Sequence, residues 1–154
     1  MAIFSPKKTI SADDLSVECL VGRAMTQIDG TAAPSEWVFH FGDRCLLNVG
    51  GTWRAAQDGR IAIAGDDHNQ LFGHKDPVDA GDRLGAIFGS RTVSKAGFDG
   101  LTGDLRIWFG ERTWLEVLTD SSGYESWTLL RPDGTLVVAM GGGEVVPLTA
   151  SGEG

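Results

Sequence analysis

The side chains best suited to chemistry lie in one polar segment, AGDDHNQLFGHKDP, at positions 64–77. It contains Asp66, Asp67, His68 and His74, and such groups close together could ligate a metal ion or form a general-base pair. The two histidines do not have a recognised ligand spacing, no cysteine lies nearby, and aspartates before a helix more often cap it. We therefore predict turn and cap roles, no metal and no cofactor. A hydrolase-like enzyme using His68 is the least favoured function.

A second polar segment, DSSGYESW at positions 120–127, could form a binding site. It lacks the glycine-flanked serine of a hydrolase nucleophile elbow, because Gly123 is followed by Tyr124. In a functional interpretation, Tyr124, Glu125 and Trp127 line a pocket with amphipathic rings and one carboxylate. In the alternative, Trp127 is a core residue, Tyr124 lies at a rim and Glu125 is a surface charge. We assign no catalytic residue and take Tyr124, Glu125 and Trp127 as candidate binding residues.

Two stretches of the chain resemble each other. Positions 38–49 read VFHFGDRCLLNV and positions 106–117 read RIWFGERTWLEV, so that five identical residues recur 68 positions later. Downstream, Asp58-Gly59 and Asp133-Gly134 each precede an apolar run, with Trp53 and Trp127 shortly before them. The extra residues of the second copy fall at positions 121–126. We predict an internal repeat of approximately residues 11–65 and 79–142.

The repeated pattern predicts a short helix followed by four or five strands in each copy. Residues 11–21 and 79–88 are the expected helices, each ended by a glycine, with Ser11 capping the first. Burial favours a three-residue turn after Phe41, which directs Cys45, and correspondingly Thr113, toward the core. Trp108 and Trp114 then fall on the opposite face, where they mark either packing between the two copies, which we favour, or an interface.

Composition restricts the class of protein. The chain has 154 residues, 42 % hydrophobic and 22 % charged, and 22 glycines, as expected for one domain (1–154) with many tight turns. A net charge of −8 argues against binding to nucleic acid or to an anionic membrane surface. Cys19 and Cys45 form no disulfide framework, and the N-terminus has no signal-peptide core, so we expect reduced cysteines and a cytoplasmic location.

The run SGYESWTLLRPDGTLVVAMGGGEV resembles the C-terminal signature of an uncharacterised bacterial family, a domain of unknown function with Tyr-Glu-Ala/Ser-Trp before Pro-Asp-Gly and Gly-Gly-Glu. The matching positions are Tyr124, Glu125, Ser126, Trp127, Pro132, Asp133, Gly134, Gly142, Gly143 and Glu144. The resemblance implies a small intracellular bacterial protein. It brings no activity and no catalytic residues.

These observations predict an α+β, β-rich domain: two pseudo-repeated antiparallel β units, packed as a sandwich or flattened barrel, with two or three short helices. The favoured function is non-enzymatic binding of a protein partner, of which toxin-neutralising immunity proteins are one version. Residues 76–154 carry twelve acids and six bases (−6), against nine and seven (−2) in residues 1–75, so the expected partner is basic. The alternative is a small-molecule pocket near Tyr124 and Trp127.

Overall fold

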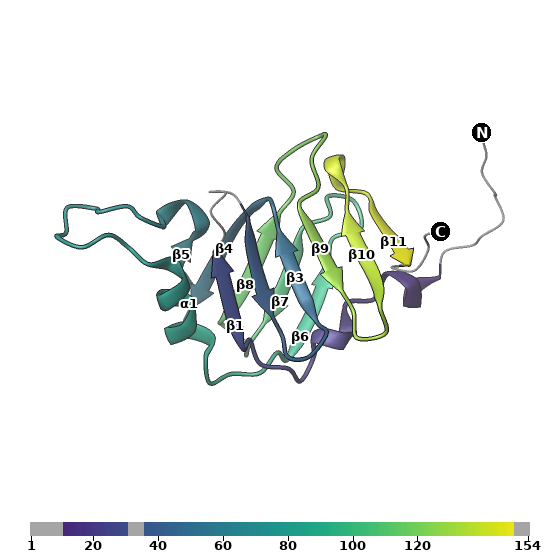
Figure 1. Ribbon diagram of the computed structural model, residues 1–154, viewed down its shortest axis with the longest axis horizontal. Coiled ribbons are helices and arrows are strands. Elements are labelled where there is room, and N and C mark those ends of the chain that lie inside the picture. The colour runs from purple at the N-terminus through teal and green to yellow at the C-terminus, as the bar shows by residue number, and fades with distance from the viewer. Residues whose placement is uncertain (1–10, 31–35, 150–154) are drawn as a thin grey trace.

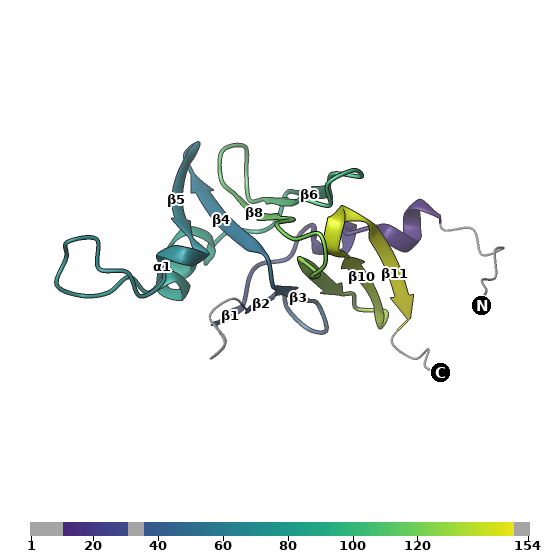
Figure 2. The same cartoon turned by 90° about the horizontal axis from the view of Figure 1, so that it is seen from above.

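The structure, a computed structural model, describes residues 11–30 and 36–149, and these residues form a sandwich of two antiparallel sheets (Figures 1 and 2). The six-stranded sheet has the order β1 (Gln27–Gly30), β2 (Trp37–His40), β3 (Leu46–Val49), β9 (Trp127–Leu130), β10 (Thr135–Ala139) and β11 (Val145–Thr149). The five-stranded sheet has the order β5 (Arg60–Ala64), β4 (Thr52–Gln57), β8 (Trp114–Leu118), β7 (Leu105–Trp108) and β6 (Lys95–Phe98).

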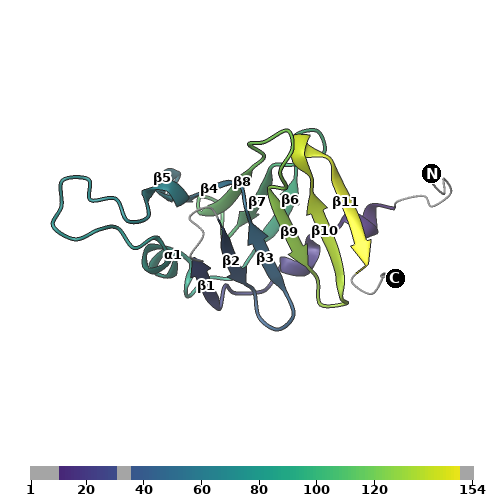
Figure 3. The same ribbon diagram turned by 45° about the horizontal axis from the view of Figure 1, so that its top comes forward.

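The prediction of a β-rich sandwich is confirmed, and the flattened barrel is wrong. In the described part of the chain the two sheets remain separate layers, with β1, β11, β5 and β6 as their edge strands. A barrel would need an edge of one sheet to pair with an edge of the other. Here α1 (Ala80–Phe88) instead packs against β1 and β5, and so covers one open side between the sheets (Figure 3).

The described residues contain one α-helix, fewer than the two or three predicted. The predicted helix at residues 79–88 is confirmed as α1, where the Asp79 side chain accepts from the Asp82 amide at 3.0 Å. Residues 11–21 instead form two 3₁₀ turns, η1 (Ala12–Leu15) and η2 (Glu18–Leu20). Ser11 caps η1 as expected, but Ser16 adopts an extended conformation (ψ 137°) that separates the turns. The Ser16 hydroxyl accepts from the Glu18 amide at 3.0 Å, and such a local hydrogen bond competes with a continuous helix.

The two predicted three-residue turns are confirmed. The Phe41 amide donates to the Cys45 carbonyl, and the Phe109 amide donates to the Thr113 carbonyl, each at 2.8 Å. Cys45 and Thr113 therefore point into the core, at 0 % and 2 % exposure. Gly42 adopts a φ of 85° in the first turn, a value that glycine reaches without steric cost. Burial of the apolar face has decided the register, as expected.

Each sheet takes strands from both predicted copies. Three strands of the first copy, β1–β3, share a sheet with β9 and β10 of the second, joined through the β3–β9 pair. Three strands of the second, β6–β8, share a sheet with β4 and β5 of the first, joined through the β8–β4 pair. The two junctions have the same register, because Val49 lies opposite Trp127 in one sheet and Val117 lies opposite Trp53 in the other. In terms of the predicted repeat, the second hairpin of each copy therefore lies in the sheet that holds the first hairpin of the other.

Side-chain contacts near the junction of the copies also recur 68 residues apart. Arg23 Nη1 donates to the Phe41 carbonyl at 3.0 Å, and Arg91 Nη1 donates to the Phe109 carbonyl at 3.2 Å. Ala24 and Thr92, again 68 positions apart, form a β-bridge with each other. Such pseudo-twofold geometry is what a duplicated unit predicts, and we retain duplication as an inference.

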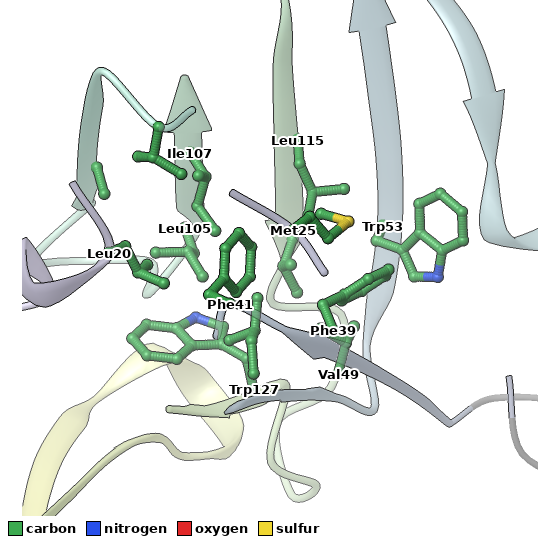
Figure 4. Packing of buried hydrophobic residues seen from close by; sticks show 14 of the residues in the cluster. Leu20, Met25, Phe39, Phe41, Val49, Trp53, Leu105, Ile107, Leu115 and Trp127 are labelled. Carbon is green, nitrogen blue, oxygen red and sulfur yellow. The ribbon is translucent and has the colours of Figure 1, made fainter. Parts of the chain in front are cut away.

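The core fills the space between the sheets with large side chains from both copies (Figure 4). Phe41 and Phe109 stack at its centre, with ring centroids 6.5 Å apart. Fully burying a side chain of this size stabilises a fold by roughly 1.5–3 kcal/mol. Other members exposed by less than 2 % are Phe39, Leu47, Trp53, Ile107, Leu115 and Trp127.

The segment that joins the copies projects from the sandwich beyond η3 (Gly65–Asp67) and returns at α1 (Figure 1). Its exposed apolar side chains include Leu71 (51 %) and Phe72 (63 %).

Among the described residues, none of the helices has the length and hydrophobicity that a membrane span requires.

Candidate functional site

The connection from β8 to β9 carries the candidate residues Tyr124 and Glu125 and is held by a set of backbone contacts. Ser121 Oγ accepts from the amides of Gly123 and Tyr124, at 3.0 and 2.9 Å. The Ser121 carbonyl accepts from the Gly142 amide at 2.8 Å, within η4 (Gly141–Gly143). These bonds fix the loop, so that Tyr124 is displayed at 81 % exposure from a defined backbone.

The backbone of the β8–β9 connection approaches η4 so closely that position 141 requires a glycine. A Cβ added at Gly141 would lie 2.5 Å from the carbonyl carbon of Gly123. Only a residue without a side chain lets the β8–β9 connection pack so tightly against this turn. The Gly-rich run is therefore part of the support for Tyr124.

Two hollows adjoin at this end of the sandwich. One, of about 750 Å³, is lined by Tyr124, Asp120 and Ser121 together with Glu36, Gly50 and Glu125. The other, of about 300 Å³, shares Glu36, Gly50 and Glu125 and continues over the outer face of β2, β3 and β9. Because three residues line both, we treat the two hollows as one acidic groove, defined by Glu36, Gly50, Asp120, Tyr124 and Glu125.

A third hollow, of about 370 Å³, extends the groove between the two sheets. It shares Gly50 and Asp120 with the groove and is also lined by Trp53 and Asp66. Asp120 is held in place by Thr52, whose amide and hydroxyl donate to its carboxylate at 3.0 and 2.6 Å. Among the described residues, the charged side chains that line the three hollows are all acidic: Glu36, Asp66, Asp120 and Glu125.

Trp127, the third candidate binding residue, is a core side chain at 1 % exposure. Its Nε1 donates to the Gly103 carbonyl at 2.8 Å, and its ring lies 5.9 Å from that of Phe98. Trp53, its counterpart in the first copy, is equally buried, but its Nε1 finds no partner among the described residues. Trp127 therefore supports the groove floor, whereas Tyr124 and Glu125 are accessible.

In the joining segment, two of the four polar residues hold backbone groups. Asp67 accepts from the Ala64 amide at 2.9 Å, and His68 Nδ1 accepts from the Ala80 amide at 3.0 Å, at the start of α1. The His68 ring also lies edge-on against Trp37, with centroids 5.2 Å apart. These contacts agree with the predicted turn and cap roles. Within residues 11–30 and 36–149, no three Asp, Glu, His or Cys side chains gather as metal ligands would.

A charged cluster that no sequence pattern predicted lies on the outer face of the five-stranded sheet. Glu116, at 4 % exposure, accepts from Arg54 Nε and Arg106 Nη2, each at 2.9 Å, and from Trp114 Nε1 at 3.0 Å. The Arg106 guanidinium lies 5.3 and 5.0 Å from the ring centroids of Trp108 and Trp114. Trp108 and Trp114 thus pack on each other and on Arg106, instead of between the two copies as predicted.

The protonation of Glu116 reflects this environment. Burial raises the pKa of its carboxyl, but hydrogen bonds from Trp114, Arg106 and Arg54 outweigh burial and hold the pKa below its ordinary value. The alternation of Arg106, Trp108, Trp114 and Glu116 is visible in the sequence, but Arg54 comes from the other copy. Only the exchange of hairpins brings it to the cluster.

Comparison with known proteins gives a family but no activity. The model of a family of unknown function (DUF6188) matches residues 34–148, which include both three-residue turns and the whole acidic groove. No curated protein and no solved structure matches the chain. Since the match takes in 115 of 154 residues (34 to 148), the chain belongs to this family of unknown function.

Proposed function

We propose that this chain is a non-enzymatic binding domain that takes a basic segment of another protein into the acidic groove. The observation that carries the proposal is the groove itself: an 81 % exposed tyrosine, held on a fixed loop among the carboxylates of Glu36, Asp120 and Glu125. Loops carried on rigid sheets are a usual place for recognition. Tyrosine supplies a large contact area at low entropic cost.

Electrostatics support a basic partner. The groove and its extension bring together carboxylates of both copies, and the second half of the chain carries a net charge of −6 (twelve acids, six bases). Complementary charge of this kind mainly raises the rate of association, and salt screens it. A toxin-neutralising immunity protein is one version of such a domain, because it too binds a partner without catalysis.

A small-molecule pocket near Tyr124 and Trp127 is the less supported alternative. Ligand pockets usually enclose most of the ligand surface, but Tyr124 is too exposed to close over a ligand. Trp127 has its indole donor engaged by Gly103. An enzyme using His68 has less support still, because His68 Nδ1 already accepts from the Ala80 amide.

The test is a pull-down from the native host with the full chain, followed by association and dissociation kinetics on the captured protein. Tyr124→Ala should weaken binding by about 2 kcal/mol, roughly thirtyfold, if the residue is a hot spot. Glu125→Gln should mainly lower the association rate, and the difference from the wild type should shrink as salt rises.

Two matched controls are available on other surfaces. Phe72→Ala removes an exposed aromatic ring from the joining segment, and Glu111→Gln removes one exposed charge from the β7–β8 turn, at the other end of β8. Both should leave binding unchanged. If Tyr124→Ala and Glu125→Gln both bind the partner as tightly and as fast as the wild type, the proposal is contradicted. Capture of only a small metabolite also contradicts it and favours the small-molecule pocket.

A further inference from the structure

The two cysteines, 26 positions apart in the chain, lie together in the structure. Cys19 belongs to η2, and Cys45 ends the first three-residue turn; both are free thiols. Arg23 links the two segments, because its Nε donates to the Cys19 carbonyl at 2.9 Å and its Nη1 donates at 3.0 Å to the carbonyl of Phe41, whose amide in turn donates to the Cys45 carbonyl. Cys45 is fully buried, whereas Cys19 is half-buried and lines a hollow of about 410 Å³. Cys19 therefore borders the hollow, whereas Cys45 is enclosed in the core.

Two arginines lie near Cys19, and hydrogen bonds to backbone carbonyls anchor both. Arg131 lines the same hollow; its Nη1 donates to the carbonyls of Asp13 and Ser16 at 2.9 Å, and its Nε donates to Thr135 at 2.7 Å. Arg23 Nε donates to the Cys19 carbonyl at 2.9 Å. Guanidinium groups fixed in this way act as permanent positive charges beside the thiol.

The surroundings of Cys19 favour its thiolate. The hydrogen bond from Cys45 lowers the pKa of Cys19 to about 7, burial opposes this, and the charges of Arg131 and Arg23 assist it against the carboxylate of Asp133. The same hydrogen bond and burial raise the pKa of Cys45. Asp13 is the other acid that lines the hollow. A thiol with a pKa near 7 is about half ionised at neutral pH and is a competent nucleophile.

The second copy has no such pair. At the positions 68 residues later, Ile87 stands for Cys19 and Thr113 stands for Cys45, and both are buried. The fold of a unit is therefore formed without sulfur at either position. The cysteines of the first copy are available for another role.

We propose that Cys19 is a hydroperoxide-reactive thiol and that Cys45 resolves its oxidised form as an intramolecular disulfide. The Cys19 thiolate attacks one oxygen of the hydroperoxide, the O–O bond breaks, and the other oxygen leaves as an alcohol or water after taking up a proton. Cys19 is then a sulfenic acid. The Cys45 sulfur attacks the Cys19 sulfur, and hydroxide leaves with the Cys45 proton as water. The two thiols lose two electrons, and the hydroperoxide gains them.

Intact-mass and peptide analysis of the full chain after treatment with hydrogen peroxide tests this proposal. The wild type should lose two hydrogen atoms and yield a peptide that links Cys19 to Cys45. Cys45→Ser keeps a hydrogen-bond donor but cannot form the disulfide, so its Cys19 should stop at the sulfenic acid, which a dimedone probe traps. Cys19→Ser should leave Cys45 reduced, because Cys45 is buried and its pKa is raised.

The pH dependence of iodoacetamide labelling separates this role from a structural one. Cys19 should be alkylated with a midpoint near neutral pH in the wild type and in Cys45→Ser, and with a higher midpoint in Cys45→Ala, which lacks the donor. If Cys19 is alkylated with the pH midpoint of a free cysteine peptide, or if peroxide leaves both thiols reduced, the proposal is overturned.

Discussion

The strands of the two sheets pair in equivalent registers, but the outer faces of the sheets carry different side chains. In the five-stranded sheet one cross-strand row reads Arg106, Glu116 and Arg54. The corresponding row of the six-stranded sheet reads Val38, Asn48 and Thr128. Both rows lie over equivalent core residues, so the fold does not require the charges. What the two copies share serves the architecture, and what only one copy has can serve another purpose.

The distinction between features found in both copies and features found in one copy also applies to the tryptophans, the Tyr124 loop and the cysteines. Both copies carry a buried tryptophan at the strand junction, Trp53 or Trp127. Only the second copy has the loop with Tyr124 and Glu125, and only the first has the cysteine pair. The shared tryptophans therefore belong to the core, while the loop and the thiols are candidates for function.

The largest expected effect comes from the shared residues. Trp53→Ala and Trp127→Ala should each lower the free energy of unfolding by about 3–5 kcal/mol, because each leaves a large cavity between the sheets. Urea unfolding of both variants measures this. If one tryptophan is nearly dispensable, the two junctions are not equivalent and the comparison fails.

A smaller loss is expected for the charged row. Glu116→Gln should cost about 2 kcal/mol, because Arg54 and Arg106 lose their common carboxylate while remaining partly solvated. Asn48→Ala, its counterpart on the other sheet, should change stability by no more than about 0.5 kcal/mol. Equal costs for the two substitutions would show that the charges add nothing to the five-stranded sheet.

The pH dependence of stability gives a second test of the role of Glu116. The folded-state pKa of Glu116 lies below its unfolded value, so the residue contributes stability at neutral pH. That contribution is lost as the pH falls from the unfolded value toward the folded one. Urea midpoints measured from neutral pH into the acid range should therefore fall less steeply in Glu116→Gln than in the wild type. Parallel curves would contradict the assignment.

The smallest effect separates the two indoles. Trp127→Phe removes the donor to the Gly103 carbonyl, whereas Trp53 Nε1 has no partner among the described residues. Trp127→Phe should therefore cost about 1 kcal/mol more than Trp53→Phe. The difference between their urea midpoints measures this. A larger cost at Trp53 would reveal that its indole N–H donates a hydrogen bond in solution.

The sequence predicts the local structure well because local rules govern it. The alternation around Phe41 and Phe109 fixes which face is buried, and that in turn fixes the three-residue turns. Asp79 caps the start of the helix α1 as capping rules predict. The helix ends at Gly89 as expected, but Gly89 is right-handed (φ −58°) and so does not form the left-handed glycine cap. The segment at 11–21 is the exception, because Val17 and Leu20 gain more from packing in the core than from helical bonds.

Long-range partners could not be predicted in the same way. Arg54 and Glu116 are 62 positions apart, and no local pattern shows that the hairpins of the two copies change places. For the same reason Glu36 and Asp120 were not recognised as neighbours of Tyr124 and Glu125. Those two candidates came from a loop present in one copy only. The burial of Trp127 was foreseeable from its match to Trp53.

The central claim, that the groove around Tyr124 is the contact surface for a protein partner, is tested most directly by photo-crosslinking. A benzophenone amino acid is introduced at position 124, and in a control chain at the exposed Phe72, and each chain is irradiated in the native host. Our account predicts one covalent adduct with a basic protein from position 124 that is absent from position 72 and weaker in a Glu125→Gln background. Adducts of equal yield from both positions, or none from position 124, would contradict it.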